Sequence, residues 1–389
     1  MSMEAKKIYK PFQALSHPLD IVKNFTPNWF TLTMGTGIVA IDLHNSPYHF
    51  PYMIPITKFI WELNIVFFTV ISLLFIARWV FFFEGAKRML HHPVQSMFIG
   101  AIPMGFATIV NGFILFYGNK YAHLDYYLWW IDAALAIISG FLVPFYMFTE
   151  HEHSLDKMTA VWLLPIVPAE VAAASGGLVA PHVDQIHAQL IVYTSYILWS
   201  LSVPLAMSIL VILFFRLAVH GLPPKDMAVS IWLTLGPIGT GALAMFLLGQ
   251  ASSGVFYNSE FELFSRLFFR VGFMIGMLLW AYGLWWYAMA IMTTIRYLKE
   301  GLPFNMGWWG FTFPLGVFTA ATIQIWIFTG FDFVKILSGI ELAMLTTFYT
   351  IVMVRTMQGV WHGSLFRAPC LSTETGLPVD KDKMLNAKI

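Results

Sequence analysis

The sequence has very little charge. Only 11% of its 389 residues are Asp, Glu, Lys or Arg, whereas a soluble globular domain carries about 25%. So few charged side chains cannot cover a water-exposed surface, which excludes an ordinary soluble protein. With a net charge of +1, the chain also has no excess of basic residues of the kind that binds nucleic acid, so no nucleic-acid partner is expected.

Cysteine and the common catalytic motifs are scarce too. The single cysteine, Cys370, excludes an internal disulfide and a thiolate metal cluster. No phosphate-binding loop, dinucleotide fingerprint or nucleophile elbow is present, which disfavours transport driven by the chain's own ATP hydrolysis. The pair of histidines in His151-Glu152-His153 is typical of a solvated loop rather than of a metal site. We therefore expect no metal, no cofactor and no enzymatic activity.

Long apolar runs are abundant instead. Hydrophobic residues make up 58% of the chain and aromatic residues 17%, with 15 Trp. A bilayer core of about 30 Å needs about 20 apolar residues per helix. The pattern predicts an all-α integral membrane protein with ten transmembrane helices. The predicted spans are 29–43, 58–82, 94–117, 126–148, 159–180, 186–215, 228–251, 263–291, 308–328 and 336–360.

The distribution of Lys and Arg predicts the orientation, because cytoplasmic loops carry an excess of these residues. We expect a cytoplasmic N-terminal segment at 1–26, a ten-helix transport domain at 27–362 and a cytoplasmic C-terminal tail at 363–389. No cleavable signal peptide is expected, since the first 20 residues are polar and basic. The chain is expected to cross a cell membrane several times, and in a bacterium this would be the inner membrane. The basic residues on the cytoplasmic side are Lys6, Lys7, Lys10, Lys87, Arg88, Lys157, Arg216, Lys225, Arg296, Lys299, Arg355 and Arg367, against Lys58, Lys120 and Lys335 outside.

The odd-numbered spans carry most of the helix breakers, whereas the even-numbered spans are richer in Phe, Leu, Ile and Trp. Lipid cannot satisfy the backbone groups that a break frees, so broken helices belong inside protein or along a wet cavity. This predicts five helical hairpins, with five kinked inner helices lining a central pore. Alternatively, Gly and Pro are simply frequent in membrane helices. The breakers are Gly35, Gly37, Gly100, Pro103, Gly105, Pro165, Pro168, Gly176, Gly177, Gly236, Pro237, Gly239, Gly241, Pro314 and Gly316.

Three segments carry a family resemblance. NFTPNWF at 24–30, followed by MGTGIV at 34–39, resembles the opening signature of the tellurite-resistance/dicarboxylate transporter family. WLLPIVPAEVAAASGG at 162–177 is similar to that family's fifth helix, and WWGFTFP at 308–314 to its ninth. The family includes malate carriers, sulfite exporters and plant slow anion channels. The resemblance implies a homotrimer in a lipid membrane, with one pore per protomer that Phe313 occludes.

Hydroxyl groups on the broken helices are candidates for contact with a small anion. Helix breaks expose N–H groups, and the positive ends of half-helices favour anions. Alternatively, each hydroxyl bonds a carbonyl of its own helix. The candidate pore-lining residues are Thr36, Thr108, Ser175, Thr240, Thr312 and Thr319.

A few charged residues fall inside predicted spans. Glu170 follows Pro168, and an intramembrane carboxylate usually faces a cavity or a partner, so it is a candidate for proton coupling or a structural group. Arg270 is a candidate anion contact near the outer end of its helix. Alternatively, Glu262 and Arg266 form a surface pair and Arg270 extends to the interface. Asp132 and Glu341 are interpreted as subunit or interhelical contacts.

The leading functional prediction is secondary transport of a C4-dicarboxylate such as malate, coupled to protons. The alternative is an anion channel or a sulfite exporter. An intramembrane enzyme is a third hypothesis, but Glu170 has no identifiable catalytic partner.

Overall fold

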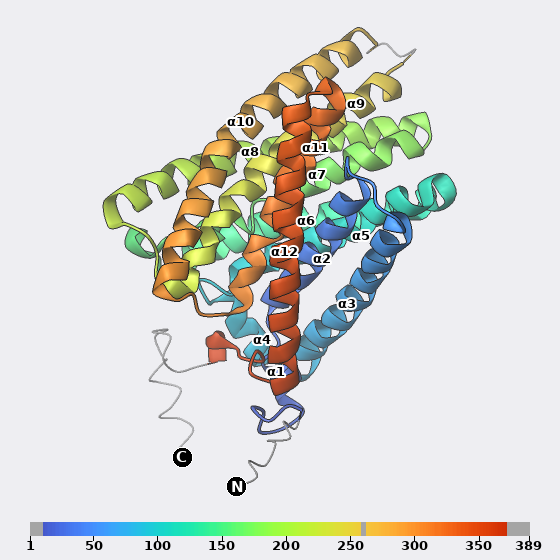
Figure 1. Ribbon diagram of the computed structural model, residues 1–389. Coiled ribbons are helices and arrows are strands. Elements are labelled where there is room, and N and C mark those ends of the chain that lie inside the picture. The colour runs from blue at the N-terminus through green and yellow to red at the C-terminus, as the bar shows by residue number, and fades with distance from the viewer. Residues whose placement is uncertain (1–10, 258–261, 372–389) are drawn as a thin grey trace.

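The computed structural model describes residues 11–257 and 262–371, and these residues form helices and no strands. Ten helices make up the body, and a helix lies at each of the ten predicted positions. Five are long and alternate along the chain with five shorter ones (Figure 1). The long helices are α3 (Met53–Phe81), α6 (Ala122–Thr149), α8 (Gln185–His220), α10 (Glu262–Glu300) and α12 (Asp332–His362). The shorter ones are α2 (Phe30–His44), α5 (Ala101–Tyr117), α7 (Pro168–Val179), α9 (Leu235–Val255) and α11 (Phe313–Thr329).

The five shorter helices form a closed ring at the centre. α2 contacts α5, α5 contacts α7, α7 contacts α9, α9 contacts α11, and α11 returns to α2. Most of their residues are buried, and the hydrophobic core is built largely from them. The prediction that the Gly- and Pro-rich helices lie inside agrees with this arrangement.

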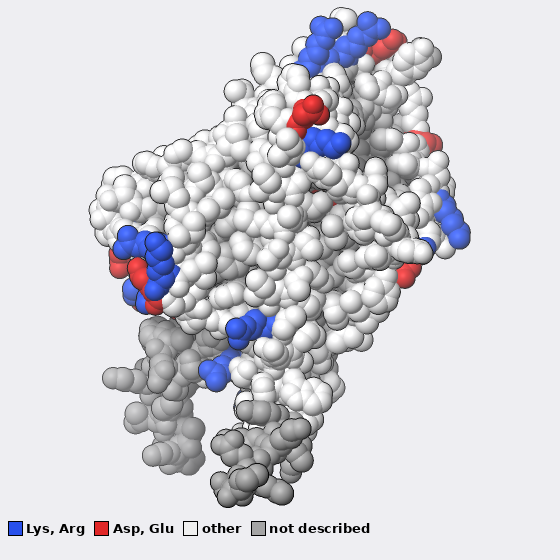
Figure 2. Space-filling model, viewed as in Figure 1, with Lys and Arg blue, Asp and Glu red and all other residues white. Residues whose placement is uncertain are grey.

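The five long helices cover the ring from outside. Each packs on the shorter helix that precedes it in the chain, for example α10 on α9 and α3 on α2. Their outward faces are apolar, with Leu73, Phe141 and Leu278 each more than 60% exposed. Figure 2 shows charged side chains gathered towards the rims of the view, with a broad uncharged surface between them. Such a surface suits lipid rather than water.

Length and composition identify seven helical segments in the described residues that could cross a membrane. One of them, Ser96–Thr149, holds both α5 and α6. α2 and α7, with 15 and 12 residues, are shorter than the roughly 20 residues that a bilayer core requires. The chain is therefore an all-helical membrane protein with several apolar spanning segments, as the composition predicts.

The helix breaks do not all lie where the sequence pattern predicts. Gly35 and Gly37 lie inside an uninterrupted α2, so the predicted break there is wrong. A Cβ on Gly35 would clash with Thr312 of the adjacent segment, and one on Gly37 would clash with Thr108 of α5. These glycines allow neighbouring helices to approach closely; they do not bend their own helix.

The irregular backbone lies instead at the entrance of each inner helix. A 3₁₀ segment precedes all five, and prolines such as Pro168 and Pro314 occupy the first positions of the helices that follow. Proline has no backbone N–H, but an N–H in the first turn of a helix has no intrahelical partner, so proline costs no hydrogen bond there. The 3₁₀ segments are η1 (Pro27–Trp29), η2 (Ser96–Gly100), η5 (Ala160–Leu163), η7 (Lys225–Thr234) and η8 (Met306–Phe311).

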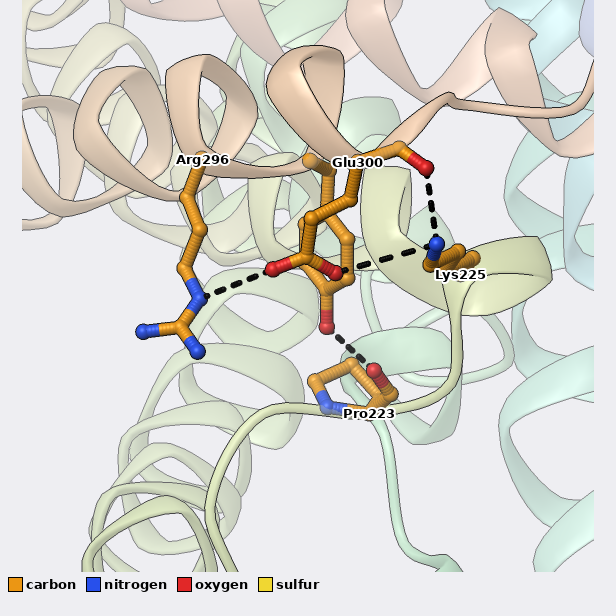
Figure 3. A network of polar contacts seen from close by, with 5 residues as sticks. Pro223, Lys225, Arg296 and Glu300 are labelled. Atoms are coloured by element: carbon orange, nitrogen blue, oxygen red, sulfur yellow. Dashed lines mark hydrogen bonds and ion pairs between the residues drawn. The ribbon is translucent and has the colours of Figure 1, made fainter.

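A polar network fixes the start of η7 against the end of α10 (Figure 3). Lys225 Nζ donates to the Glu300 carbonyl at 2.7 Å, and Arg296 Nε lies 3.4 Å from Glu300 Oε1. The Tyr297 hydroxyl donates to the Pro223 carbonyl. Exposed ion pairs of this kind contribute little to stability. These contacts connect α10 to η7, a segment at the entrance of the ring.

Candidate functional site

A cavity of about 600 Å³ lies where the 3₁₀ segments enter the ring. We call it the vestibule. Its lining is mainly apolar and includes the charged side chains of Asp226 and Arg367. Every 3₁₀ segment at the ring contributes to it, through Asn28, Phe98, Val161, Ser230 and Gly307. The vestibule therefore lies on the axis that the five inner helices share.

A second cavity, of about 60 Å³, lies further along the same axis, between the inner helices themselves. We call it the inner cavity. All five inner helices line it, through Ile38 of α2, Thr108 of α5, Ala174 of α7, Thr240 of α9 and Val317 of α11. A space of this size holds one small ion or a few water molecules.

Phe313 separates the two cavities. It is the one described residue that lines both, and its side chain is only 3% exposed. It is the first residue of α11 and precedes Pro314, so its backbone is held at the junction between η8 and α11. A bulky ring at a narrow point closes a pore by packing and by excluding water. The geometry thus places Phe313 where a gate would act.

The inner cavity offers polar groups that have no protein partner. The Thr240 hydroxyl is buried and makes no hydrogen bond, and neither does the Asn111 side-chain oxygen. Gln324 accepts a hydrogen bond from Gln250 at 2.9 Å through its oxygen, which leaves its amide N–H groups available. A buried polar group without a partner costs about 1–3 kcal/mol. Such groups around a small cavity are suited to a bound ion or water.

Two of the six predicted hydroxyl residues, Thr108 and Thr240, line the inner cavity. Thr108 donates to the Gly105 carbonyl at 2.7 Å and accepts from Asn64 at 3.0 Å. The other four line neither cavity and donate to carbonyls of their own segment, the alternative that the sequence left open. These bonds are Thr36 to Leu32 at 2.8 Å, Ser175 to Val171 at 3.2 Å, Thr312 to Trp309 at 2.7 Å and Thr319 to Leu315 at 2.9 Å.

Glu170 also lies outside the two cavities. Its carboxylate is fully buried beside Ser202 of α8, and a Cβ on Gly241 of α9 would lie 3.6 Å from Oε2. The Ser202 hydroxyl donates to the Ile166 carbonyl at 2.9 Å, and neither carboxylate oxygen has a hydrogen-bond partner. Glu170 therefore occupies the junction of α7, α8 and α9.

The remaining charged candidates are placed as follows. Arg266 and Arg270 are exposed on the outer helix α10 and line neither cavity. Asp132 of α6 and Glu341 of α12 are fully buried within one protomer. They therefore lie between helices, and the subunit contact considered for them does not fit this burial.

The sequence pattern did not single out Asp42, Asn111 or Gln324, all of which line the inner cavity. Asp42 fell at the predicted end of the first span, where a charge is unremarkable. Helical spacing contained the missing signal, because Ile38, Ile41, Asp42 and Asn45 follow an i, i+3, i+4, i+7 pattern and share one helix face.

Comparison with known proteins gives matches over most of the chain. The model of the SLAC1 family, described as voltage-dependent anion channel, matches residues 24–357. A sulfite efflux pump of Arthroderma benhamiae is 40% identical over 89% of this chain and 93% of its own length. A sulfite efflux pump of Arthroderma otae is 42% identical over 85% of this chain and 87% of its own length. A malic acid transport protein of Schizosaccharomyces pombe is 22% identical over 78% of this chain and 71% of its own length.

Proposed function

The chain belongs to the SLAC1 family of anion channels and transporters, and we propose that it exports sulfite across a cell membrane. The family resemblance predicted from the sequence motifs is confirmed. The two Arthroderma sulfite efflux pumps match at 40% and 42% identity, whereas the malic acid transport protein matches at 22%. These similarities favour the sulfite exporter, the alternative named from the sequence, over the malate carrier.

The observation that carries the proposal is the arrangement of vestibule, Phe313 and inner cavity on one axis. An inner cavity of about 60 Å³ suits a small inorganic ion. A C4-dicarboxylate has at least twice as many non-hydrogen atoms as sulfite. The Thr240 hydroxyl and the amide N–H groups of Gln324 and Asn111 supply hydrogen-bond donors for oxygen atoms of the ion.

We further propose that all ten helices cross the membrane as five hairpins and that the inner five enclose one pore per protomer. The closed ring of helix contacts and the apolar outer faces support this arrangement. Both termini are proposed to be cytoplasmic because of the Lys and Arg bias. Phe12 N donates to the Trp361 carbonyl at 2.7 Å, which holds the two ends of the described chain together. The homotrimer rests on the family resemblance alone.

In this proposal sulfite enters the vestibule from the cytoplasm, and displacement of the Phe313 ring admits it to the inner cavity. Thr108 and Thr240 are the hydroxyl residues that line this inner cavity. Proton coupling through Glu170 and anion contact at Arg270 stay predictions, since both residues lie outside the cavities.

The proposal is tested in host cells that lack their own sulfite exporter. Expression of the chain should restore growth on sulfite and lower the sulfite content of the cells. Ala320 lines the inner cavity, and Ala320→Phe should fill that cavity and abolish the rescue at equal membrane expression. A second host that lacks malate uptake provides the comparison. Restored malate uptake without sulfite tolerance would show that the proposed substrate is wrong.

A further inference from the structure

Asp42 is a carboxylate in the wall of the inner cavity. It lies one turn from Ile38 on α2, is fully buried, and neither of its oxygens has a hydrogen-bond partner. Thr240 lines the same cavity from α9, and its buried hydroxyl is also without a partner. Two unpaired polar groups from different helices thus face one small space that is suited to a ligand.

The charged neighbour of Asp42 is Glu341 of α12, and the two carboxylates interact electrostatically. Glu341 is fully buried, lies beside Thr322 of α11 and has no hydrogen-bond partner. No cation of the described chain offsets this pair.

The other helices packed against α2 present neutral groups to the cavity. α5 contributes Asn111 and α11 contributes Gln324. The ionisable residues of α3 are engaged elsewhere: Lys58 and Glu62 pair at 4.0 Å on the surface, and Arg78 donates to the Phe25 and Gly85 carbonyls. On α2 itself, the His44 ring packs against Phe116 and contacts Thr57 at 3.4 Å.

The charge state of Asp42 decides what the inner cavity can accept. An ionised carboxylate in so small a space repels an anion, and the low dielectric of the interior strengthens the repulsion. The carboxylic acid has no charge and carries an O–H donor, so it stabilises an anion in place of repelling it. Asp42 therefore stabilises an anion when its carboxylate carries a proton, and repels the anion when the carboxylate is ionised.

We propose that Asp42 is a specificity-determining residue of the inner cavity: its carboxylic acid form donates a hydrogen bond to a small oxyanion, and its ionised form excludes anions. The inference rests on the proposed anion pathway and adds the residue that makes this pathway depend on pH.

Nitrate is the probe for the test, because its charge is constant over the pH range in which sulfite itself takes up a proton. Full-length protein in liposomes is assayed for nitrate flux at equal internal and external pH. Wild-type flux should be high in acid and should fall by about tenfold for each pH unit above a midpoint, as for one titrating group. Asp42→Asn keeps an N–H donor and cannot ionise, so its flux should be nearly independent of pH.

Asp132→Asn is the matched control, since Asp132 is a fully buried carboxylate of α6 that lines neither cavity. It should keep the wild-type profile. If Asp42→Asn does not fold, the wild-type profile still decides, because a flux that does not change with pH excludes a titrating residue in the inner cavity.

A wild-type profile that does not change with pH would overturn the inference, as would an Asp42→Asn variant that keeps the wild-type pH dependence. Failure of the proposed function looks different: neither nitrate nor sulfite would cross at any pH.

Discussion

Gly239 of α9 lies directly against the backbone of Phe318 in α11. A Cβ on Gly239 would lie 2.7 Å from the Phe318 amide nitrogen and 2.8 Å from its Cα. Backbone atoms cannot rotate away as a side chain can, so this contact between two inner helices requires glycine. Because α11 begins with Phe313, the contact also helps to position the residue that separates the cavities.

Gly239→Ala should therefore destabilise the protein, by about 1–3 kcal/mol as for other overpacked sites. Gly236→Ala is the matched control in the same helix, since nothing lies within 4 Å of a Cβ at Gly236. Thermal unfolding in detergent should show a lower midpoint for Gly239→Ala and an unchanged or higher one for Gly236→Ala. Equal midpoints would mean that α9 and α11 are not packed this closely.

Phe313→Ala should raise anion flux, because it removes the ring that separates the vestibule from the inner cavity. Phe318→Ala removes the same ring from the same helix, but Phe318 packs against Trp280 and Tyr287 and lines neither cavity. It should lower stability, by about 3–5 kcal/mol for a buried Phe, without raising flux. Liposome flux assays compare the two. An unchanged flux in well-folded Phe313→Ala would remove Phe313 from the gate.

Thr240→Val should weaken substrate binding, since it removes an unpaired hydroxyl from the inner cavity while keeping the shape of the side chain. A neutral hydrogen bond contributes about 0.5–1.5 kcal/mol, which corresponds to about a two- to tenfold rise in the half-saturating sulfite concentration. Thr319→Val provides the control, as the Thr319 hydroxyl bonds the Leu315 carbonyl away from the cavity. Concentration series in liposomes measure both variants, and equal effects would exclude a specific role for Thr240.

Glu170→Gln tests proton coupling at the junction of α7, α8 and α9. If Glu170 carries a proton during the cycle, net transport driven by a pH gradient should fall, while exchange at fixed pH survives. A purely structural carboxylate would instead give a variant with altered stability and intact coupling. Both transport modes are measured in the same liposomes, and full pH-driven transport in the variant would contradict coupling through Glu170.

The helix positions could be predicted from the sequence because long apolar runs determine them. The inner location of the Gly- and Pro-rich helices was also predictable, since irregular backbone needs protein or water around it. The positions of the helix breaks could not be predicted from the sequence. Glycines permit a bend and a close contact equally well, and in α2 Gly35 and Gly37 serve contact with Thr312 and Thr108.

The candidate site was predictable only in part. Thr36 and Thr240 both lie in Gly-Thr-Gly triplets, yet Thr240 lines the inner cavity and Thr36 bonds the Leu32 carbonyl. The rotation of each helix about its own axis decides which hydroxyl faces the cavity, and a triplet carries no information about that rotation. Asp42 was missed for a related reason: its place near the end of a span concealed that its helix face points inward.

Sulfite and malate efflux from the same preloaded liposomes, measured with wild-type protein and with Phe313→Ala, tests the proposed substrate and route most directly. Wild-type protein should release sulfite, Phe313→Ala should release sulfite faster, and malate efflux from wild-type protein should be much slower. Malate efflux at a rate equal to or above that of sulfite in the wild type, with no effect of Phe313→Ala on either anion, would contradict both the substrate and the route.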